Sequence, residues 1–535
     1  MSNGSICFLL SRLARAGRYP RLGGVNAKIH LVRWSSTSAP DSAPRQWSTP
    51  LAKTIAEAIS VRIPHLAVIY QKIVLLCSNQ IRTIPQVTGP ISIAAYMRQC
   101  LTFPDGGYYT SRGQEAEGTE VFGAKGDFVT SPEISQIFGE LLGIWTVAEW
   151  MGQGRRKGGV QIIELGPGKG TLMADMLRSI RNFKTFASAI EAVYLVEAST
   201  VLREVQHKLL CGDAPTEEIE VGYKSTSVHL GVPVIWTEHI KLLPDEPDKT
   251  PFIFAHEFFD ALPIHAFQSI ETPPRSQTIN TPTGPATLHN PPATSSSPAT
   301  QWRELVVSPN PEIPELKSGN EPEFHLSLAK SPTPSSLVLP EMSPRYKAMK
   351  STPGSTIEIS PEGQTCAQDI ARRIGGSFSS SSSEQSNKKR VPSGAALILD
   401  YGTTSTIPIN SLRGIRKHQL VSPFAVPGQV DISANVDFTA LAEAAIDASP
   451  GVEVYGPVEQ CQFLEALGIS KRASQLLTKV EGEGGEEKRK RIESGWKRLV
   501  ERGGGGMGKL YKALAIVPES GGRRRPVGFG VSVLG

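Results

Sequence analysis

A glycine-rich loop is the segment of this chain whose residues most clearly suggest chemistry. Residues 161–171 read Q-I-I-E-L-G-P-G-K-G-T, so that Gly166, Gly168 and Gly170 directly follow an apolar run. Glycines let the backbone turn tightly and let a ligand approach the main chain closely. The start of the helix expected after the loop favours polar or negative ligand groups. The segment therefore predicts a nucleotide- or cofactor-binding loop.

Neighbouring residues distinguish three kinds of nucleotide site. A dinucleotide-binding loop needs Gly in the third position of Gly-x-Gly-x-x-Gly, where this chain has Thr171. A phosphate-binding P-loop needs Ser or Thr directly after Gly-Lys, but Lys169 is followed by another Gly. Glu164 precedes the first Gly, and a carboxylate favours a cationic sulfonium cofactor, S-adenosylmethionine (SAM), over a phosphate. The predicted cofactor-binding residues of the loop are Glu164, Gly166, Gly168 and Gly170.

A second acidic residue ends the strand expected at 193–196. Glu197 stands in the sequence Y-L-V-E-A-S, 27 residues beyond Gly170. A carboxylate at the end of this strand can accept hydrogen bonds from both ribose hydroxyls of an adenosyl cofactor. Enzymes that use NAD share this feature, so Glu197 supports a cofactor-binding sheet without selecting the cofactor. The alternative is a Glu that caps a helix or faces solvent.

A third group of polar residues follows the apolar strand expected at 252–255. In open α/β sheets, ligands bind beyond the carboxyl ends of strands, and this strand ends in His256, Glu257 and Asp260. Glu257 and Asp260 could hold the N–H donors of a guanidinium and stabilise a cationic transition state. They are predicted to be catalytic, with His256 in the substrate cleft. A metal held by His256, Glu257 and His265 is disfavoured because the spacing suits no helix.

Four further residues are predicted at the same site. Asp400 and Tyr401 end an apolar strand at 395–399, so they are expected in the substrate cleft. Asp127 and Ser131 precede or begin a helix and are expected to line the cofactor pocket as part of an N-terminal lid. For each of the four, helix capping or turn formation is the structural alternative.

Strands and helices alternate through the part of the chain that carries these residues. This alternation predicts an α/β fold with a parallel sheet covered by helices on both faces. Strands are expected at 160–165, 193–196, 232–236, 252–255, 395–399, 452–455 and 511–517. Helices are expected at 51–59, 91–101, 133–150, 172–180, 201–210 and 458–467.

Composition divides the chain into six segments. They are a transit peptide at 1–47, an N-terminal helical lid region at 48–150 with an inserted stretch at 60–87, the first part of the sheet domain at 151–263, an inserted subdomain at 264–394, the remainder of the sheet domain at 395–517, and a flexible tail at 518–535. The Pro/Ser/Thr-rich tracts 271–301 and 377–389 are predicted to be disordered. Strands at 302–307 and 355–359 and a helix at 366–374 are expected within the subdomain, and 403–438 is expected to be a loop.

Charge and apolar patterning exclude several classes of protein. Residues 1–40 hold six Lys and Arg and no acidic residue, as is typical of a mitochondrial transit peptide. The rest of the chain therefore carries a net charge of −1, which argues against binding driven by nucleic-acid phosphates. The basic run at 488–491 follows two Glu and is predicted to be a solvated helix face. No stretch of 18 apolar residues predicts a membrane span, and the six widely spaced cysteines form no CxxC pair.

Five motifs in a fixed order resemble one family. They are G-D-F-V-T-S-P-E at 126–133, E-L-G-P-G-K-G at 164–170, E-F-F-D-A-L-P at 257–263, L-D-Y-G at 399–402 and P-G-Q-V-D at 427–431. Over roughly 88–270 and 300–517 the chain is similar to the MidA-like methyltransferases, whose mitochondrial members are arginine methyltransferase assembly factors of respiratory complex I. The chain departs from this family at His256, where the family commonly has Asn.

The resemblance implies a seven-stranded class I (Rossmann-like) methyltransferase fold and SAM as cofactor. It also implies a protein substrate in complex I, symmetric dimethylarginine as the product, and location in the mitochondrion, in the matrix. We expect direct methyl transfer to a guanidinium nitrogen, with Glu257 accepting the proton that this nitrogen loses. The alternatives are a non-catalytic assembly chaperone, which would tolerate Glu257→Gln, and an NAD(P)-dependent oxidoreductase, which Thr171 disfavours.

Overall fold

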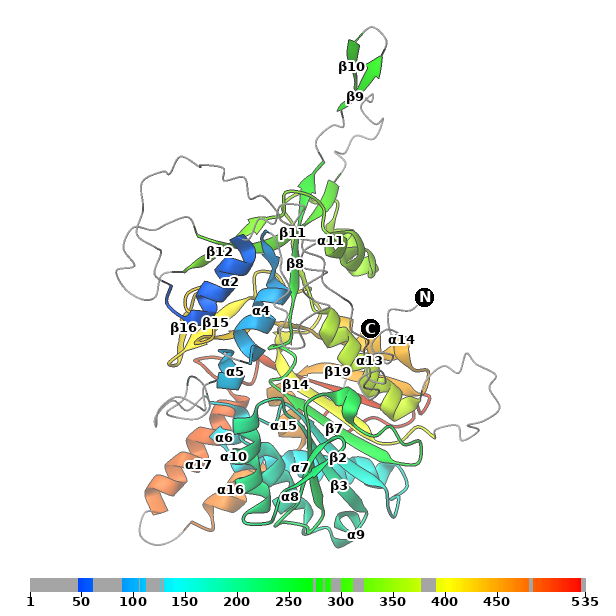
Figure 1. Ribbon diagram of the computed structural model, residues 1–535. Coiled ribbons are helices and arrows are strands. Elements are labelled where there is room, and N and C mark those ends of the chain that lie inside the picture. Colours follow the sequence, from blue (N-terminus) through cyan, green and yellow to red (C-terminus); the bar gives the residue numbers. More distant parts are fainter. Residues whose placement is uncertain are drawn as a thin grey trace, which may run out of the picture. The chain divides into compact units, whose positions relative to one another are not determined.

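The computed structural model describes residues 47–60, 89–104, 106–111, 127, 129–272, 276–281, 284–289, 300–310, 322–376, 391–480 and 485–530. Apart from Trp47 and Ser60, the predicted transit peptide and the predicted insertion at 60–87 lie outside these ranges, as does the tract at 377–389. The described elements begin with α2 (Pro50–Ser60) and end with β20 (Tyr511–Pro518) (Figure 1).

A ten-stranded mixed sheet forms the centre of the fold (Figure 1). Seven of its strands lie in the order β6–β3–β2–β7–β14–β20–β19; the first five are parallel, and β20 is antiparallel to both of its neighbours. In that order their bounds are Pro233–Thr237, Ile190–Val196, Val160–Leu165, Thr250–His256, Ala395–Thr403, Tyr511–Pro518 and Val452–Glu459. The predicted seven-stranded sheet is confirmed. Three additional strands extend it: β5 (Gly222–Thr226), β4 (Glu217–Ile219) and β18 (Val436–Asp437).

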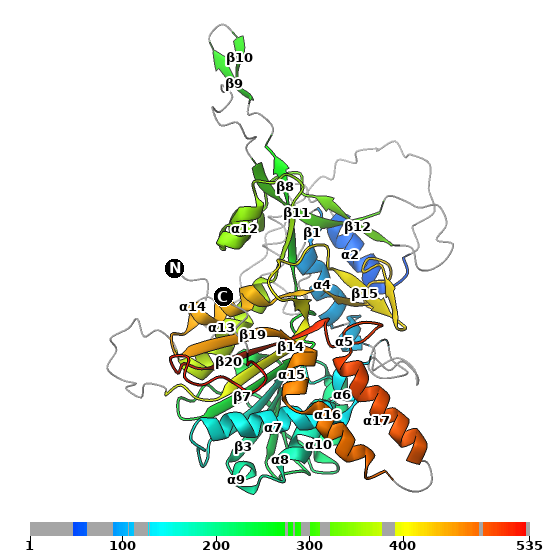
Figure 2. The same cartoon turned by 180° about the vertical axis from the view of Figure 1, so that it is seen from behind.

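Helices cover both faces of this sheet because its central strands are apolar on both sides (Figure 2). In β7, Phe252 and Phe254 pack toward one face, and Ile253 and Ala255 pack toward the other. Each of these four side chains is at most 1% exposed, and burying a large apolar side chain contributes about 1.5–3 kcal/mol. The covering helices are α7 (Gln136–Gly152) and α8 (Thr171–Ile180) on the first face, and α13 (Pro361–Gly375) and α14 (Phe438–Ala448) on the second.

A second, antiparallel sheet combines four strands inserted between β7 and β14 with one strand, β1, from the N-terminal part of the chain. Its order is β1–β11–β8–β13, with β12 paired to β11, and helices α2 and α4 pack onto it. The bounds are Ile91–Ser92 for β1, His265–Glu271 for β8, Thr300–Pro309 for β11, Phe324–Leu328 for β12, Thr356–Ile359 for β13 and Ile93–Thr102 for α4. Because β7 and β14 are parallel neighbours, this insertion leaves the central sheet continuous.

Two predictions of irregular chain differ from the structure. The tract 271–301 contains an antiparallel hairpin of β9 (Ser276–Thr281) and β10 (Gly284–His289). Pro282 and Gly284 stand close to where the two strands meet, and both are common turn residues, although the overall composition of the tract concealed this signal. The tail at 518–535 is described as far as residue 530, and Phe529 is buried against the ring of Phe463.

The segment 403–438, predicted to be a loop, contains a three-stranded antiparallel sheet. Its order is β16 (Gln419–Val421), β15 (Arg413–Arg416) and β17 (Asp431–Ser433). The β15–β16 turn holds Lys417 and His418 at φ of 50° and 59°, values that commonly indicate Gly or Asn in a sequence. The strands were missed because a contact distant in sequence, described below, holds this turn.

The helix predicted at 133–150 is two helices, because Ser135 interrupts it. Ser135 has extended backbone at φ −154° and ψ 125°, and its hydroxyl accepts a hydrogen bond from the Ile137 N–H at the start of α7. The preceding α6 (Ser131–Ile134) begins at the capping residue Thr130. This break turns the chain so that α6 borders the pocket described below while α7 covers the sheet.

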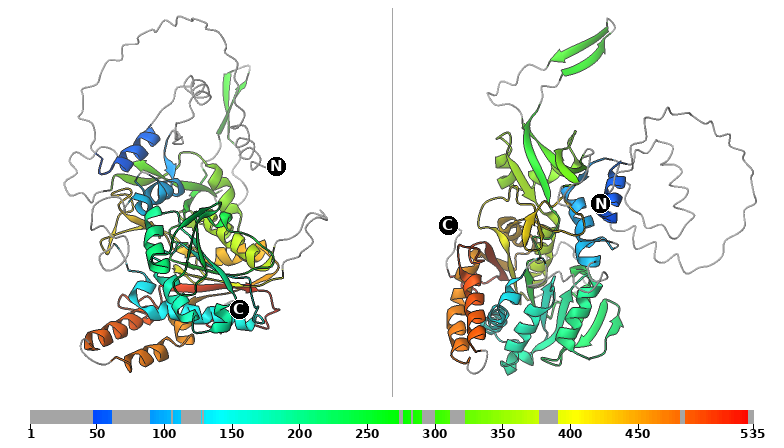
Figure 3. Two further views of the ribbon diagram at one scale, coloured as in Figure 1. Left: turned by 60° about the horizontal axis from the view of Figure 1, so that its bottom comes forward. Right: turned by 90° about the vertical axis from the view of Figure 1, so that its left-hand side faces the viewer.

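Three helices join β19 to β20. They are α15 (Gln460–Ala466), α16 (Ile469–Leu477) and α17 (Gly485–Val500), and Figure 3 shows α16 and α17 side by side. The basic run at 488–491 lies exposed on α17, so the predicted solvated helix face is confirmed. Within the ranges given above, no helix combines the length and the apolarity that crossing a membrane requires.

Candidate active site

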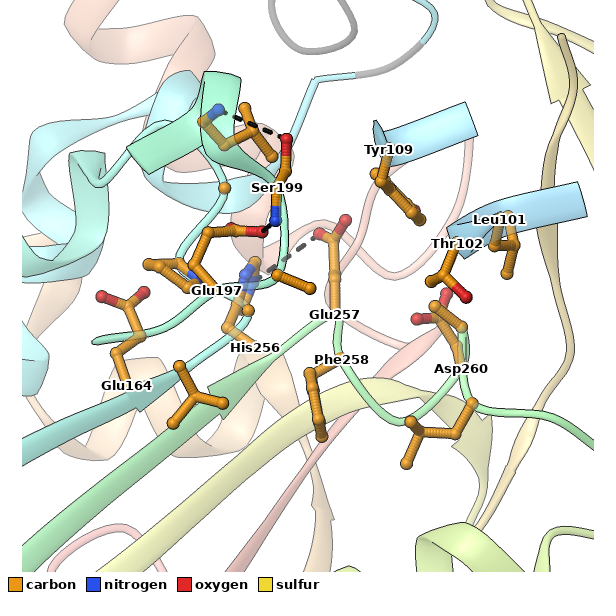
Figure 4. A pocket seen from close by; sticks show the side chains of 18 of the residues that line it. Leu101, Thr102, Tyr109, Glu164, Glu197, Ser199, His256, Glu257, Phe258 and Asp260 are labelled. Atoms are coloured by element: carbon orange, nitrogen blue, oxygen red, sulfur yellow. Dashed lines mark hydrogen bonds and ion pairs between the residues drawn. The ribbon is translucent and has the colours of Figure 1, made fainter. Parts of the chain in front are cut away.

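A pocket of about 500 Å³ opens beyond the carboxyl ends of β2, β3 and β7. Its location agrees with the general rule for ligand sites in open α/β sheets. Figure 4 shows two ends, with Glu257 between them. We call the end formed by the glycine loop with Glu164 and Glu197 the glycine-loop end. We call the end formed by Tyr109, Asp260 and Asp431 the acidic end, and Glu257 lies where it meets the glycine-loop end.

Most of the predicted site residues come together at this pocket. Those that line it are Glu164, Gly166, Gly168, Glu197, His256, Glu257, Asp260 and Tyr401. Four others lie behind the lining, namely Gly170, Asp127, Ser131 and Asp400.

The glycine loop needs glycine for both conformation and space. Gly166, Gly168 and Gly170 have φ of 64°, 55° and 83°, in the left-handed region that side chains disfavour. A Cβ added to Gly166 would lie 2.9 Å from the ring of Phe258. Gly170 is the N-cap of α8, so the loop delivers its backbone N–H groups at the start of that helix. The sequence between β2 and α8 therefore builds a main-chain cradle.

Glu164 and Glu197 form a buried acidic pair at the glycine-loop end. They are 3% and 8% exposed, and burial raises the pKa of Glu164 to about 8 and that of Glu197 to about 7. The charge of Glu197 further raises the pKa of Glu164. The Oε2 atom of Glu164 is buried and has no hydrogen-bond partner in the described part of the chain. A bound cation with N–H donors would compensate these charges.

A buried glutamine that the sequence analysis did not identify holds this end together. The side-chain amide of Gln206 donates to the carbonyl of Gly168 at 2.6 Å and to Oε2 of Glu197 at 3.1 Å. Its Oε1 accepts a hydrogen bond from the indole N–H of Trp236 at 2.9 Å. Leu202, Gln206 and Leu210 fall four residues apart on one face of α10 (Thr200–Cys211). A polar residue on that apolar stripe was the available signal.

Replacing Gln206 by Leu should weaken SAM binding about tenfold and lower the unfolding free energy by about 1–3 kcal/mol, because the Trp236 N–H loses its buried partner. Gln206→Glu, of equal size, restores an acceptor for Trp236 but places a carboxyl against Glu197. It should therefore recover stability at low pH without recovering SAM affinity at pH 8. Calorimetric titration and urea unfolding measure the two effects. Unchanged SAM affinity in both variants would contradict this role.

The acidic pair predicts opposite effects of pH on stability and on binding. Since the folded-state pKa of Glu164 exceeds its ordinary value of 4.5, the ligand-free fold binds more protons than the unfolded chain between pH 4.5 and 8, and it loses stability as pH rises. Glu164→Gln should therefore stabilise the ligand-free protein at pH 8, with no gain near pH 4.5. The same change should weaken SAM binding at pH 8 by about 10–100-fold, because a charged acceptor is lost. Urea unfolding and SAM titration at both pH values test this.

The chain turns sharply where β7 ends at the pocket. Glu257 has a φ of 50°, an uncommon value for a non-glycine residue, and Oε1 of its carboxyl group accepts a hydrogen bond from the Tyr511 hydroxyl at 2.9 Å. Burial and the nearby Asp260 raise the pKa of Glu257 well above its ordinary value. His256 lies between the rings of Phe138 and Tyr511, and burial lowers its pKa to about 3. His256 is therefore neutral, and it packs as an aromatic ring.

Asp400 fixes the backbone of this turn by accepting hydrogen bonds. It is fully buried, and its Oδ2 accepts hydrogen bonds from the backbone N–H groups of residues 258, 259 and 260 at 3.1, 2.9 and 3.3 Å. Its Oδ1 accepts the N–H of Tyr401 at 2.8 Å. The Tyr401 ring itself reaches the pocket, with the guanidinium of Arg413 4.9 Å from its centre. Asp400 is thus a positioning residue rather than a lining residue.

The two predicted lid residues, Asp127 and Ser131, contact the structure around the pocket and do not line the pocket itself. The Asp127 carboxylate accepts hydrogen bonds from the Tyr108 hydroxyl at 2.8 Å and from the Lys417 N–H at 2.7 Å, and its carbonyl accepts the His418 N–H at 2.9 Å. Asp127 therefore holds the β15–β16 turn. Ser131 is fully buried in the first turn of α6. Its neighbours Thr130, Pro132 and Glu133 line the pocket instead.

The disfavoured metal alternative finds no support in these contacts. His265 begins β8, and its Nδ1 lies 2.7 Å from Oε1 of Glu304. Among the described residues, no three His, Cys, Asp or Glu side chains are arranged to hold a metal ion.

Comparisons with known proteins find methyltransferases. A family model described as "Putative S-adenosyl-L-methionine-dependent methyltransferase" matches residues 141–458. The protein arginine methyltransferase NDUFAF7, mitochondrial, of Rattus norvegicus is 33% identical over 436 residues, which cover 81% of this chain and 82% of that protein. The Homo sapiens protein of the same name is 33% identical over 396 residues, 73% of each chain.

A solved structure shares the fold. The crystal structure of a COG1565 superfamily member from Burkholderia thailandensis, bound to S-adenosyl-homocysteine, superposes with a TM-score of 0.58 at 20% identity. The match covers 92% of this chain and 98% of that one.

Proposed function

We propose, starting from the fact that this chain belongs to the family of SAM-dependent methyltransferases, that it methylates arginine side chains of a protein. It is a mitochondrial enzyme, like the relatives that carry that word in their names. We further propose that it acts in the matrix on a subunit of respiratory complex I and forms symmetric dimethylarginine. The relatives' names support the arginine acceptor, and the resemblance to the MidA-like family suggests the finer points.

The glycine-loop end fits the cofactor. Gly166 and Gly168 line the pocket without side chains, so a ligand can approach the main chain closely there. Oε2 of Glu164, which has no hydrogen-bond partner among the described residues, is suited to an ammonium donor. We expect Glu197, which directly follows β3, to accept the ribose hydroxyls. When bound, SAM supplies an electrophilic methyl group.

The acidic end supports a guanidinium acceptor, and the pairing of Glu257 with Asp260 is the observation that carries this proposal. Both carboxyl groups line the same pocket as the glycine loop, and burial, together with neighbouring carboxyl groups, raises their pKa values. A bound cation would stabilise their charged forms. A guanidinium brings that charge together with five N–H donors. Glu257 accepts the proton that the reacting nitrogen loses, and the Tyr511 hydroxyl holds this carboxylate in place.

The test is transfer of radiolabelled methyl from SAM by the purified chain to a mitochondrial fraction that contains complex I, with Gly166→Val as the control. Label recovered as symmetric dimethylarginine in a complex I subunit, and absent with the control, is the expected result. Label on another residue type would refute the arginine proposal. Bound SAM without any transfer to this fraction would favour the chaperone alternative.

A further inference from the structure

Asp431 reaches the acidic end of the pocket from outside the central sheet. It begins β17 and is 6% exposed, and it lines the pocket together with Ser433 of the same strand. The Ala434 N–H, just after this strand, donates to the carbonyl of Asp260 at 2.9 Å. The small sheet is therefore joined directly to the turn that carries Glu257 and Asp260.

A tyrosine from a third segment fixes the Asp431 carboxylate. The hydroxyl of Tyr109, in α5 (Tyr108–Ser111), donates to Oδ1 of Asp431 at 2.7 Å. Tyr109 lines the pocket, and Figure 4 shows it on the same side as Asp260. Asp431 is thereby held at one rotamer, which reduces the entropy lost when a ligand binds.

Three carboxyl groups from two distant segments thus share a small volume. All three line the pocket, and burial raises the pKa of both Glu257 and Asp260, with a smaller contribution from the charge of Asp431. Arg413 offsets part of this charge, since it lowers the pKa of Asp260. That guanidinium donates to Asn435 at 2.7 Å and faces the Tyr401 ring. The three carboxyl groups line one end of the pocket, so they supply acceptors for a ligand that carries several N–H donors.

We infer that Asp431 is a specificity residue, held by Tyr109, that accepts hydrogen bonds from the acceptor guanidinium while Glu257 faces the reacting nitrogen. A carboxylate accepts two parallel N–H bonds from a guanidinium, so Asp260 and Asp431 together can satisfy the donors that Glu257 does not. This inference rests on the proposed function. It predicts discrimination against a neutral side chain of the same shape, because citrulline places a carbonyl oxygen against a carboxylate where arginine places N–H donors.

Binding of N-acetylargininamide and of its citrulline counterpart to the full chain, saturated with S-adenosylhomocysteine, tests the inference. The wild type should prefer arginine about 100-fold or more, and Asp431→Asn should lose about 10–100-fold of that preference with S-adenosylhomocysteine affinity unchanged. Tyr109→Phe should lose less of this preference, because the Asp431 carboxylate remains but no longer accepts the hydrogen bond that holds it in place. Asp447→Asn removes an exposed carboxyl on α14 that does not line the pocket, so it is the matched control and should keep the preference.

The possible outcomes distinguish a failure of this inference from a failure of the proposed function. A wild type that prefers arginine, together with an Asp431→Asn variant that keeps the same preference, overturns the role of Asp431 and leaves the proposed function standing. If Asp431→Asn no longer binds S-adenosylhomocysteine, the Tyr109→Phe variant tests the inference instead. A preference for arginine as strong as that of the wild type in this variant would also overturn the role of Asp431. A wild type without preference for arginine refutes the proposed function itself.

Discussion

Replacing Glu257 by Gln is expected to lower kcat for methyl transfer by about 10²- to 10⁴-fold, the contribution of a positioned general base. The amide keeps the size of the side chain but cannot accept a proton from the guanidinium. SAM affinity should change less than twofold, because Glu257 lies between the two ends of the pocket and the cradle is formed by the glycine loop. Single-turnover rates and calorimetric titration of SAM measure the two quantities separately.

The pH dependence of the wild-type enzyme distinguishes a base from a residue that only binds. Because burial and Asp260 raise the pKa of Glu257, this carboxyl is protonated at low pH and cannot accept a proton. The rate of transfer should therefore increase with pH, and Glu257→Gln should abolish this increase. Glu191→Gln, an exposed acid on β3 that pairs with Lys249, is the control and should leave both the rate and its pH profile unchanged. Equal losses of rate and SAM affinity in Glu257→Gln would refute the role of Glu257 as a base.

A Gly166→Val variant should lose SAM binding by about 100-fold or more, because two separate costs coincide. A Cβ at this position meets the Phe258 ring at 2.9 Å, and a β-branched residue at φ of 64° is strained by about 1–3 kcal/mol. The side chain must therefore displace either Phe258 or the loop that cradles the cofactor. Equilibrium dialysis with labelled SAM measures the loss.

A Gly231→Val variant distinguishes the effect of backbone strain from that of a steric clash with Phe258. Gly231 has a φ of 70°, close to that of Gly166, but a Cβ there has no described atom within 4 Å. This variant should lose similar stability and keep full SAM binding. Retained SAM binding in Gly166→Val, or equal losses of binding in both variants, would show that the loop does not need glycine for the reason given.

The sequence predicted the elements whose signals are local. Buried parallel strands such as β2 and β7 are continuous apolar runs, and the loop between β2 and α8 carries its glycines in a recognisable spacing. The polar residues directly after these strands were consequently placed at one edge of the sheet. Eight of the twelve predicted site residues line the pocket for that reason.

The remaining site residues depend on contacts that no local pattern encodes. Asp127 was expected at the cofactor, yet it holds a turn 290 residues away through the Lys417 N–H. Asp431 lies in a segment predicted to be a loop, and it reaches the pocket only because β17 joins the turn after β7. In the sequence Gln206 is an ordinary helical residue. Its role arises from hydrogen bonds to three residues in three other segments of the chain. Tertiary packing determines each of these roles.

The position of β20 bears on when a growing chain can complete its central sheet. This strand follows both β14 and β19 in the chain, yet it lies between them in the interior of the sheet. It also supplies Tyr511, the hydrogen-bond partner of Glu257. A chain synthesised only as far as β19 therefore lacks both the strand that joins β19 to β14 and the hydroxyl that holds the Glu257 carboxyl. A product that ends before Tyr511 would leave β14 without its antiparallel neighbour, as an exposed sheet edge open to pairing with other chains.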